Sequence, residues 1–246
     1  MLPEVSSTNS HALHLAQSNA VHGTVVVAER QTAGRGRFDR SWFSPSGLNL
    51  YASIILRPLF PFSHMSWIPL VTGLALTKAI HQTSGLRSTL KWPNDLLWNE
   101  RKLGGILCEG SSQGPDNHFV IIGVGVNVNM TDLDFPEDLR PVSTSIRIST
   151  QRLLNRNTLL ASILNAMETL YEQLLSGQID PIHQAYTAQC GTLGRDLLVQ
   201  LTNKEEFFAR AYRIGKDGSL HVSLKHTPDH AIRVIHSGEV THMKSI

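Results

Sequence analysis

The segment Gln31-Thr32-Ala33-Gly34-Arg35-Gly36-Arg37-Phe38-Asp39-Arg40-Ser41-Trp42 lies between two apolar runs of the chain. The run before it, Thr24–Val27, is β-branched and predicts a buried strand. The run after it, residues 47–57, predicts a second strand. Residues 31–46 are therefore expected to form a long loop inserted between two core strands. A loop of this length within a compact domain is usually functional.

The chemistry of this loop suits an anion. Residues 34–40 hold three arginines and two glycines in seven positions. Glycine lets the backbone approach a ligand closely, and arginine pairs with carboxylate or phosphate through a planar, permanently charged fork. The position of the loop between core strands favours a lid over an anion. The alternatives are a solvated basic loop and a short nucleic-acid-binding tail.

The composition indicates a globular protein with a sizeable core. The 246 residues are 41% hydrophobic and 17% charged, which predicts one or two domains. A net charge of +2 is too small for bulk binding of polyanions, so the basic loop is a local feature. Cys108 and Cys190 match no Cys-x-x-Cys pattern and suggest a reducing compartment. Because neither a signal peptide nor a run of about 20 apolar residues is visible, we expect a cytoplasmic enzyme or binding protein.

Apolar spacing and turn residues predict the remaining elements. We expect helices over residues 10–19, 65–84, 157–177 and 181–188, the third of them capped by Asn157. We expect strands over residues 90–98 (broken at Pro93), 102–109 and 118–129, with a turn at 114–117. From about Gly191 onward, short β-rich runs separated by turns suggest a small barrel of roughly 55 residues.

Three further segments carry residues suited to chemistry. Ser6–Asn9 either caps the first helix or also offers hydrogen bonds to a small polar ligand. Lys102, at the start of a buried strand, requires a charged partner or a cavity. The alternate glycines of Gly123–Asn127 lie on one strand face, where they allow either close strand packing or a flat ligand against bare backbone. They do not complete a Gly-x-Gly-x-x-Gly fingerprint, so a Rossmann site is not supported.

A structural zinc site is not expected from the histidines. The pairs His11/His14 and His226/His230 come closest to ligand spacing, but no cysteine or acidic cluster completes either site. The cationic segments instead suit a reaction that brings two anions together. Activation of a carboxylate by ATP is such a reaction, because cations must neutralise both reactants and the transition state.

Five motifs occur in an order that resembles the biotin protein ligase (biotin–[acetyl-CoA-carboxylase] ligase) family. They are Ser6–Asn9, Gln31–Arg37, Lys91–Asp95, Arg101–Leu107 and Gly123–Asn127. The resemblance covers residues 5 to about 240 and implies an α+β fold. In that fold a mixed or antiparallel sheet with packed helices forms a catalytic domain like that of class II aminoacyl-tRNA synthetases. A small C-terminal SH3-like β-barrel follows it.

The resemblance also implies a domain division and a reaction. The catalytic domain would span residues 1–189 and the barrel domain residues 190–246. Biotin and ATP with Mg²⁺ would give biotinyl-5′-adenylate and pyrophosphate. The biotinyl group would then pass to a lysine of the carboxyl-carrier domain of a biotin-dependent carboxylase. No metal ligand from the protein alone is implied, and Mg²⁺ would arrive with ATP.

Carried over motif by motif, the resemblance implies roles for individual residues. The residues implied for biotin are Ser7, Thr8, Asn9, Gln31, Arg35, Gly36, Arg37, Lys102, Gly123 and Gly125. Those implied for the nucleotide are Arg37, Arg40, Trp42, Lys91, Asn94 and Asn127. Lys102, Arg35 and Asp95 are the implied catalytic residues. Asp95 would orient or deprotonate the acceptor lysine, or would only shape its turn.

Two other functions stay open at this point. A lipoate or octanoate ligase or transferase shares the fold and the use of a lysine. A non-catalytic nucleic-acid-binding protein could use the arginine loop and the barrel, although the low net charge argues against it. Because about five residues precede the first motif, we expect no winged-helix domain and no DNA partner. A membrane partner is not expected either, and a homodimer is compatible with the resemblance. Phe38-Asp39 stands where the family can carry Arg-Gly.

Overall fold

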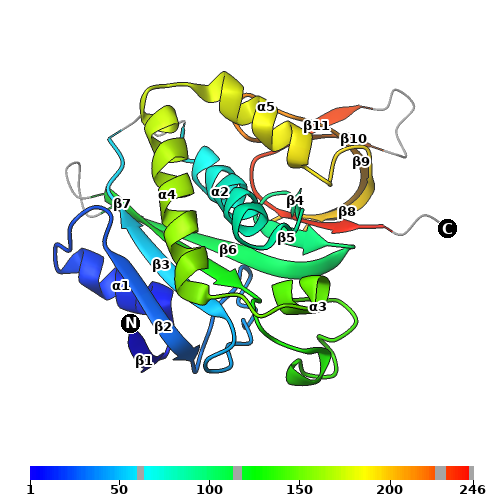
Figure 1. Cartoon of the computed structure of the whole chain (residues 1–246). Helices are drawn as coiled ribbons and strands as arrows, with labels where there is room; N and C mark the ends of the chain where they lie inside the picture. The colour runs from blue at the N-terminus through cyan, green and yellow to red at the C-terminus, as the bar shows by residue number, and fades with distance from the viewer. Residues whose placement is uncertain (60–63, 113–117, 225–230, 244–246) are drawn as a thin grey trace.

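The structure is a computed structural model that describes residues 1–59, 64–112, 118–224 and 231–243. The turn expected at residues 114–117 and the pair His226/His230 lie outside the described residues. Two β-sheets and the helices that pack against them make up the described part (Figure 1). No helix within it is long and apolar enough to span a membrane.

The larger sheet has seven strands in the order β1-β2-β3-β7-β6-β5-β4. The strands are β1 (Leu2–Val5), β2 (Val25–Gln31), β3 (Leu50–Leu56), β4 (Thr89–Lys91), β5 (Asp95–Trp98), β6 (Arg101–Ser112) and β7 (His118–Val126). The pair β1 and β2 is parallel, whereas the other neighbours are antiparallel, so the sheet is mixed. The strand expected over residues 118–129 lies at the centre of the sheet and ends at Val126.

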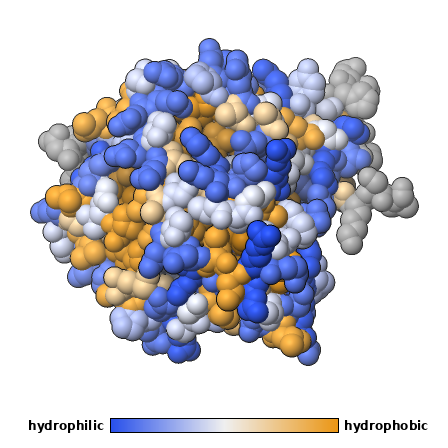
Figure 2. All heavy atoms as spheres, in the orientation of Figure 1, coloured by the Kyte–Doolittle hydropathy of each residue, from blue (hydrophilic) through white to orange (hydrophobic). Residues whose placement is uncertain are grey.

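Helices cover both faces of this sheet. They are α1 (Thr8–Gln17), α2 (Trp67–Ser84), α3 (Ile146–Thr150), α4 (Arg156–Leu175) and α5 (Ile179–Gln189). One face packs against α2 and α4, and the other packs against α1 (Figure 1). The view of the α4 side in Figure 2 shows hydrophilic side chains interrupted by hydrophobic patches.

The alternation of side chains along β7 explains how this strand serves two cores. Ile122 belongs to the core under α2 and α4, whereas Ile121 belongs to the core under α1. Both side chains are fully buried. Burial of an isoleucine side chain contributes about 1.5–3 kcal/mol relative to exposure. By the same alternation Gly123 and Gly125 share the α1 face with Ile121. This face carries the site described below.

The smaller sheet is antiparallel and comes from the C-terminal part of the chain. Its strands, in the order β11-β10-β9-β8-β12, are β8 (Asp196–Gln200), β9 (Glu206–Ile214), β10 (Leu220–Leu224), β11 (Ile232–Ile235) and β12 (Glu239–His242). Buried residues of this sheet join the same core as α2 and α4. The indoles of Trp67 and Trp92 also donate to the carbonyl oxygens of Lys216 and Gly218, each over 3.0 Å. The expected α+β class is confirmed, and the division at residue 189 stays a prediction.

Several element boundaries differ from those expected. Helix α1 begins at Thr8 rather than Ser10, because the Ser7 hydroxyl accepts the N–H of Ser10 and caps the helix. The expectation that Asn157 caps α4 is wrong. Asn155 is the cap, because its side-chain oxygen accepts the N–H groups of residues 157 and 158 over 2.9 and 3.1 Å. Strand β1 and helix α3 were not expected from the sequence.

Candidate active site

Two adjoining cavities lie where the arginine loop crosses the sheet. The first, the α1 cavity, has a volume of about 60 Å³ and lies between α1 and the strands β6 and β7. The second, the seam cavity, has a volume of about 200 Å³ and is closed on one side by Glu239 and Val240 of the smaller sheet. The residues that line both cavities are Gly36, Arg37, Trp42, Asn94 and Lys102.

The structure brings the expected site residues together in two groups. Ser7, Thr8, Asn9, Gln31, Arg35, Gly36, Arg37, Lys102, Gly123 and Gly125, all implied for biotin, line the α1 cavity. Arg37, Arg40, Trp42, Lys91, Asn94 and Asn127, all implied for the nucleotide, line the seam cavity. Asp95 also lines the seam cavity.

A hydrogen-bonded cluster of neutral side chains forms one end of the α1 cavity. Gln31 Oε1 accepts both the backbone N–H of Thr8, over 2.8 Å, and its hydroxyl, over 3.0 Å. The Ser53 hydroxyl lies 2.6 Å from Asn9 Oδ1 and 2.8 Å from Thr8 Oγ1. Ser53 was missed from the sequence, where it looks like one more residue of a buried strand. Thr8 and Asn9 are buried, so their polar groups face the interior of the protein rather than the solvent.

The two glycines of β7 make room for side chains of this protein. A Cβ atom on Gly123 would lie 2.2 Å from Asn9 Oδ1, and one on Gly125 would lie 2.7 Å from the Trp42 ring. The glycine strip is therefore covered by Asn9 and Trp42, which corresponds to the close packing that the sequence left open beside a flat ligand on bare backbone. Any larger residue at either position would displace one of these two side chains.

The arginine loop is folded back on itself. Gly36 N donates to Arg40 O over 2.7 Å, and Trp42 N donates to Gly34 O over 2.8 Å. Phe38 and Asp39 lie at the tip of the loop with φ of 55° and 57°. Left-handed backbone costs a non-glycine residue roughly 1–2 kcal/mol. Asp39, which stands where the family can carry glycine, therefore has a strained backbone in this chain.

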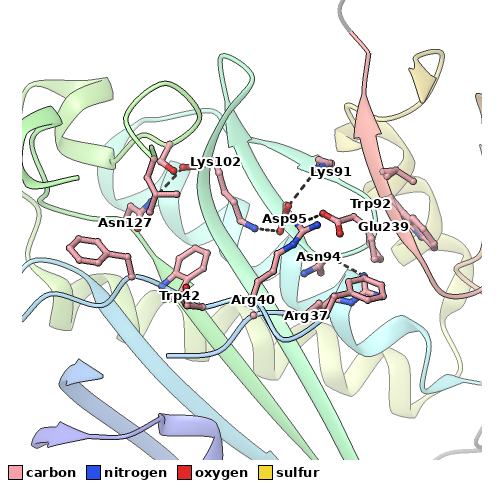
Figure 3. Close-up of a pocket in the computed structure, with 18 of the residues that line it drawn as sticks. Arg37, Arg40, Trp42, Lys91, Trp92, Asn94, Asp95, Lys102, Asn127 and Glu239 are labelled. Atoms are coloured by element: carbon pink, nitrogen blue, oxygen red, sulfur yellow. Dashed lines mark hydrogen bonds and ion pairs between the residues drawn. The ribbon is translucent and has the colours of Figure 1, made fainter. Parts of the chain in front are cut away.

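Most cations of the site face a carboxylate. Arg35 Nη2 lies 2.8 Å from Glu109 Oε2. Lys102 Nζ lies 2.8 Å from Asp95 Oδ1, and Lys91 Nζ lies 3.7 Å from Asp95 Oδ2. Arg40 forms an ion pair with Glu239 of β12 (Figure 3). The partners Glu109 and Glu239 were missed, because no local sequence signal marks them. The expectation that Lys102 has a charged partner or faces a cavity is confirmed, since it does both.

Arg37 and Lys91 are largely withdrawn from water. Arg37 Nη1 donates to Gly238 O over 2.9 Å and to Asn94 Oδ1 over 3.3 Å. Burial lowers the pKa of Arg37, and the nearby carboxylates of Glu239 and Asp95 only partly oppose this shift. Burial also lowers the pKa of Lys91, again against the opposing effect of Asp95. Because these two cations have lost much of their hydration, an incoming anion would stabilise their charged forms.

The side chains of Trp42 and Asn127 lie near that of Lys102 in the seam cavity, on the side away from Asp95 (Figure 3). Lys102 Nζ is 5.4 Å from the centroid of the Trp42 ring, within reach of a cation–π interaction. Trp42 Nε1 is buried without a hydrogen-bond partner. Asn127 Nδ2 donates to Thr144 O over 3.0 Å and so ties the end of β7 to the segment before α3. The unpaired indole N–H is a donor available to a ligand.

No group of three or more His, Cys, Asp or Glu side chains in the described ranges is arranged to hold a metal ion. The seam cavity nevertheless offers oxygen donors from Asp95, Glu239 and Asn94. Mg²⁺ is commonly held by substrate phosphates, waters and one or two carboxylates. These donors therefore fit a cation that arrives with phosphates.

The model of the Biotin/lipoate A/B protein ligase family matches residues 1–127. The chain belongs to this family. The chain is 34% identical to the bifunctional ligase/repressor BirA of Bacillus subtilis, over 88% of this chain and 66% of that protein. It thus spans about two thirds of the length of that relative. It is 32% identical to the biotin–[acetyl-CoA-carboxylase] ligase of Paracoccus denitrificans, over 83% of this chain and 86% of that protein. Within the family it groups with the biotin protein ligases.

Solved structures agree with this assignment. The biotin protein ligase of Aquifex aeolicus, in complex with biotin and ATP, superposes with a TM-score of 0.84 at 28% identity. The match covers 99% of this chain and 97% of that one. Both sheets described above are therefore part of the shared architecture.

Proposed function

We propose that this chain activates biotin with ATP and transfers the biotinyl group to a lysine of a carrier protein. The carrier is a biotin carboxyl-carrier domain of a biotin-dependent carboxylase, and the reaction takes place in the cytoplasm. Residues 1–189 would form the catalytic domain, and residues 190–246 would form a C-terminal domain that closes the nucleotide side. The observation that carries the proposal is that the α1 cavity and the seam cavity meet at Arg37 and Lys102.

The proposed first step needs two anions at this junction. An oxygen of the biotin carboxylate attacks the α-phosphorus of ATP, and the bond to pyrophosphate breaks. Arg37 and Lys102 line both cavities, so their charges would neutralise the carboxylate and the α-phosphate together. Arg35, on the α1 side, would bind the carboxylate. Each charge-assisted hydrogen bond is worth about 1.5–3 kcal/mol.

The nucleotide would occupy the seam cavity. Arg40 and Lys91 would bind phosphate oxygens, and Trp42, Asn94 and Asn127 would contact the adenosine part. Mg²⁺ bound to the phosphates would add positive charge there, next to the oxygens of Asp95, Glu239 and Asn94. The ureido ring of biotin would exchange hydrogen bonds with the neutral cluster of the α1 cavity.

In the second step the lysine amine of the carrier attacks the adenylate carbonyl, and AMP leaves. Asp95 Oδ1 and Oδ2 face Lys102 and Lys91. When phosphates bind those two lysines, the Asp95 carboxylate becomes available to accept a proton from the incoming amine. Asp95 would therefore act as a base and would also shape its turn.

Both cavities are smaller than typical small-molecule sites. Small-molecule sites have volumes of about 300–1,000 Å³, whereas these cavities measure about 60 and 200 Å³. Trp42 covers Gly125, and the arginine loop crosses both cavities. Ligand entry would thus require the loop and the indole to shift, and the bound adenylate would hold the loop closed.

The decisive test is incubation with ATP, labelled biotin and a carrier domain. We expect biotin-dependent formation of adenylate and labelling of one carrier lysine. Transfer of lipoate or octanoate in place of biotin would select the related acyl ligase, which the family description also covers. Absence of any acyl transfer, with salt-sensitive binding to DNA, would select the nucleic-acid-binding alternative.

A further inference from the structure

A buried hydrogen-bond relay connects the smaller sheet to the turn between β4 and β5. The backbone N–H of Trp92 donates to Thr192 Oγ1 over 3.0 Å, and this oxygen lies 3.0 Å from His242 Nε2. Thr192 is fully buried, and the His242 side chain is 8% exposed. Trp92 follows β4, Thr192 lies between α5 and β8, and His242 ends β12. The relay therefore joins three parts of the chain that are distant in sequence.

The direction of the hydrogen bond between Thr192 and His242 depends on the tautomer of the imidazole. In the tautomer with no proton on Nε2, the Thr192 hydroxyl accepts the N–H of Trp92 and donates its single proton to His242 Nε2. His242 then carries its own proton on Nδ1, which is buried and lies 3.6 Å from Glu100 Oε2. Arg195 holds Glu100 in place through two bonds of 2.8 and 2.6 Å. The geometry thus fits a neutral imidazole that accepts at Nε2.

The relay ends at the residues that line the seam cavity. Lys91 and Pro93 flank Trp92, and both line that cavity together with Asn94 and Asp95. The Trp92 indole is fixed separately by its bond to Gly218 O. The backbone N–H of Trp92 has Thr192 Oγ1 as its hydrogen-bond acceptor. Any change at Thr192 Oγ1 would therefore shift the backbone that carries Lys91 and Asn94.

We propose that His242 and Thr192 are positioning residues for the nucleotide half of the reaction. They hold the segment Lys91–Asp95 in the geometry that receives ATP, and they do so only while His242 is neutral. The inference rests on the proposed function, since it assigns the seam cavity to ATP. Neither residue lines that cavity, so both would act through Trp92.

The surroundings of His242 define how acid would disturb the relay. The charged groups that face it are Lys91 from β4, Arg195 ahead of β8 and Glu100 from the turn before β6. Burial lowers the pKa of His242, with further lowering by Lys91 and Arg195, and Glu100 opposes the shift. Protonation would turn Nε2 into a donor and set a second cation beside Lys91. The Thr192 hydroxyl would then lose its acceptor.

The test compares Michaelis constants from about pH 8 down to about pH 5, because the pKa of His242 lies below the usual imidazole value. We expect the KM for ATP of the wild type to rise about threefold to tenfold toward the acid end, because one neutral hydrogen bond is lost. The KM for biotin should change less than about twofold over the same range. His242→Gln keeps an acceptor that does not titrate, so its KM for ATP should be nearly independent of pH. Thr192→Val should raise the KM for ATP at every pH.

A matched control and a substrate-free readout make the test decisive. His221→Gln changes a histidine of β10 that lines neither cavity, and it should retain the acid-side rise. In the wild type, ¹⁵N NMR of the His242 ring should show the proton on Nδ1 at neutral pH. A proton on Nε2 would overturn the relay even if no substrate were turned over.

The kinetic outcomes separate this inference from the proposed function. If the wild type neither forms biotinyl adenylate nor transfers biotin at any pH, the proposed function fails, and NMR still decides the relay. If the wild type is active but His242→Gln keeps the acid-side rise, the positioning role is wrong. It is also wrong if Thr192→Val lowers the melting temperature and leaves the ratio of the two KM values unchanged.

Discussion

The α1 cavity and the seam cavity are neighbours, but they are built on different principles. One end of the α1 cavity is formed by neutral side chains that bond to one another, such as Thr8 with Gln31 and Asn9 with Ser53, and Arg35, Arg37 and Lys102 line the cavity as well. The seam cavity is lined by charges held in pairs, such as Lys102 with Asp95 and Arg40 with Glu239. Neutral polar groups suit an uncharged ring system, whereas paired charges can be rearranged around a phosphate.

The two cavities also differ in where their residues come from. The α1 cavity is built from α1, the loop and the strands β6 and β7 of the larger sheet. The seam cavity needs β12 of the smaller sheet, whose Glu239 pairs with the loop and whose preceding residue Gly238 accepts from Arg37. The comparison teaches that the second sheet belongs to the nucleotide side of the site. The following substitutions and conditions should separate the two cavities.

The largest effect is expected from Lys102→Met, which removes a charge at the junction of both cavities. Loss of one electrostatic donor of a transition state costs about 100- to 1,000-fold in kcat. We expect adenylate formation to fall by this factor while the melting temperature changes little, since the Lys102 side chain is 36% exposed. Quenched-flow measurement of biotinyl adenylate provides the readout.

The neighbouring cation supplies the control for this substitution. Arg101 pairs with Asp132 on the surface and lines neither cavity. Arg101→Met should therefore leave the rate within about twofold of wild type, in line with the small contribution of surface ion pairs. Equal losses in both variants would refute a specific role for Lys102.

Gly123→Ala should damage the α1 cavity selectively. The added Cβ would lie 2.2 Å from Asn9 Oδ1, so Asn9 must move away from its contacts with Ser53 and Glu109. Displacement of positioning groups by about 1 Å can cost about 100-fold. We expect calorimetry to show biotin binding weakened by about this factor and binding of a non-hydrolysable ATP analogue retained.

Gly110→Ala is the matched control, because nothing lies within 4 Å of a Cβ at that position in β6. It should bind biotin as the wild type does. If the Gly123→Ala variant bound biotin normally, the assignment of this cavity would have to be abandoned.

The salt dependence of ligand affinity should also differ between the two cavities, although by a smaller factor. Raising NaCl from about 50 mM to about 500 mM shortens the Debye length severalfold and screens partly exposed charges. We expect affinity for the ATP analogue to fall about threefold to tenfold. The affinity for biotinol, which lacks the carboxylate, should hardly change, because its uncharged ring system would face the neutral cluster of the α1 cavity and it carries no charge for the cations to bind. Equal salt dependence for both ligands would contradict the contrast between the cavities.

The smallest effect is expected at the tip of the arginine loop. Asp39 has a φ of 57°, so Asp39→Gly relieves left-handed backbone. The gain is offset in part by the greater freedom of glycine in the unfolded chain, and we expect about 0.5–1 kcal/mol of added stability. Chemical denaturation measures this change. Asp39→Ala cannot relieve the strain, and a gain of the same size in that variant would show that backbone conformation is not its cause.

The sequence predicted those parts of the fold that depend on local pattern. The apolar run of β7 and the helical spacing of α2 and α4 were sufficient to place these elements. Strand β1 was missed because it is four residues long, contains Pro3 and Glu4, and is paired on one edge only. The cap of α4 was misplaced because Asn155 and Asn157 are equally good caps by residue type.

For the site, the sequence identified cations and glycines but not what faces them. Glu109 and Glu239 lie 74 and 199 residues from their arginine partners, and no periodicity signals such pairs. The cover of Gly125 by Trp42 depends on how the loop folds back over the sheet, which residue types alone do not specify. Pairings across long loops are a property of the tertiary structure, so they emerge only with the three-dimensional arrangement.

The most direct test of the central claim is exchange of labelled pyrophosphate into ATP. If the two cavities meet at a junction that joins biotin to the α-phosphate, the wild type will catalyse exchange only when biotin is present. Lys102→Met will reduce that exchange by about 100-fold or more. Exchange that proceeds equally well without biotin, or a Lys102→Met variant that exchanges at the wild-type rate, would contradict the account.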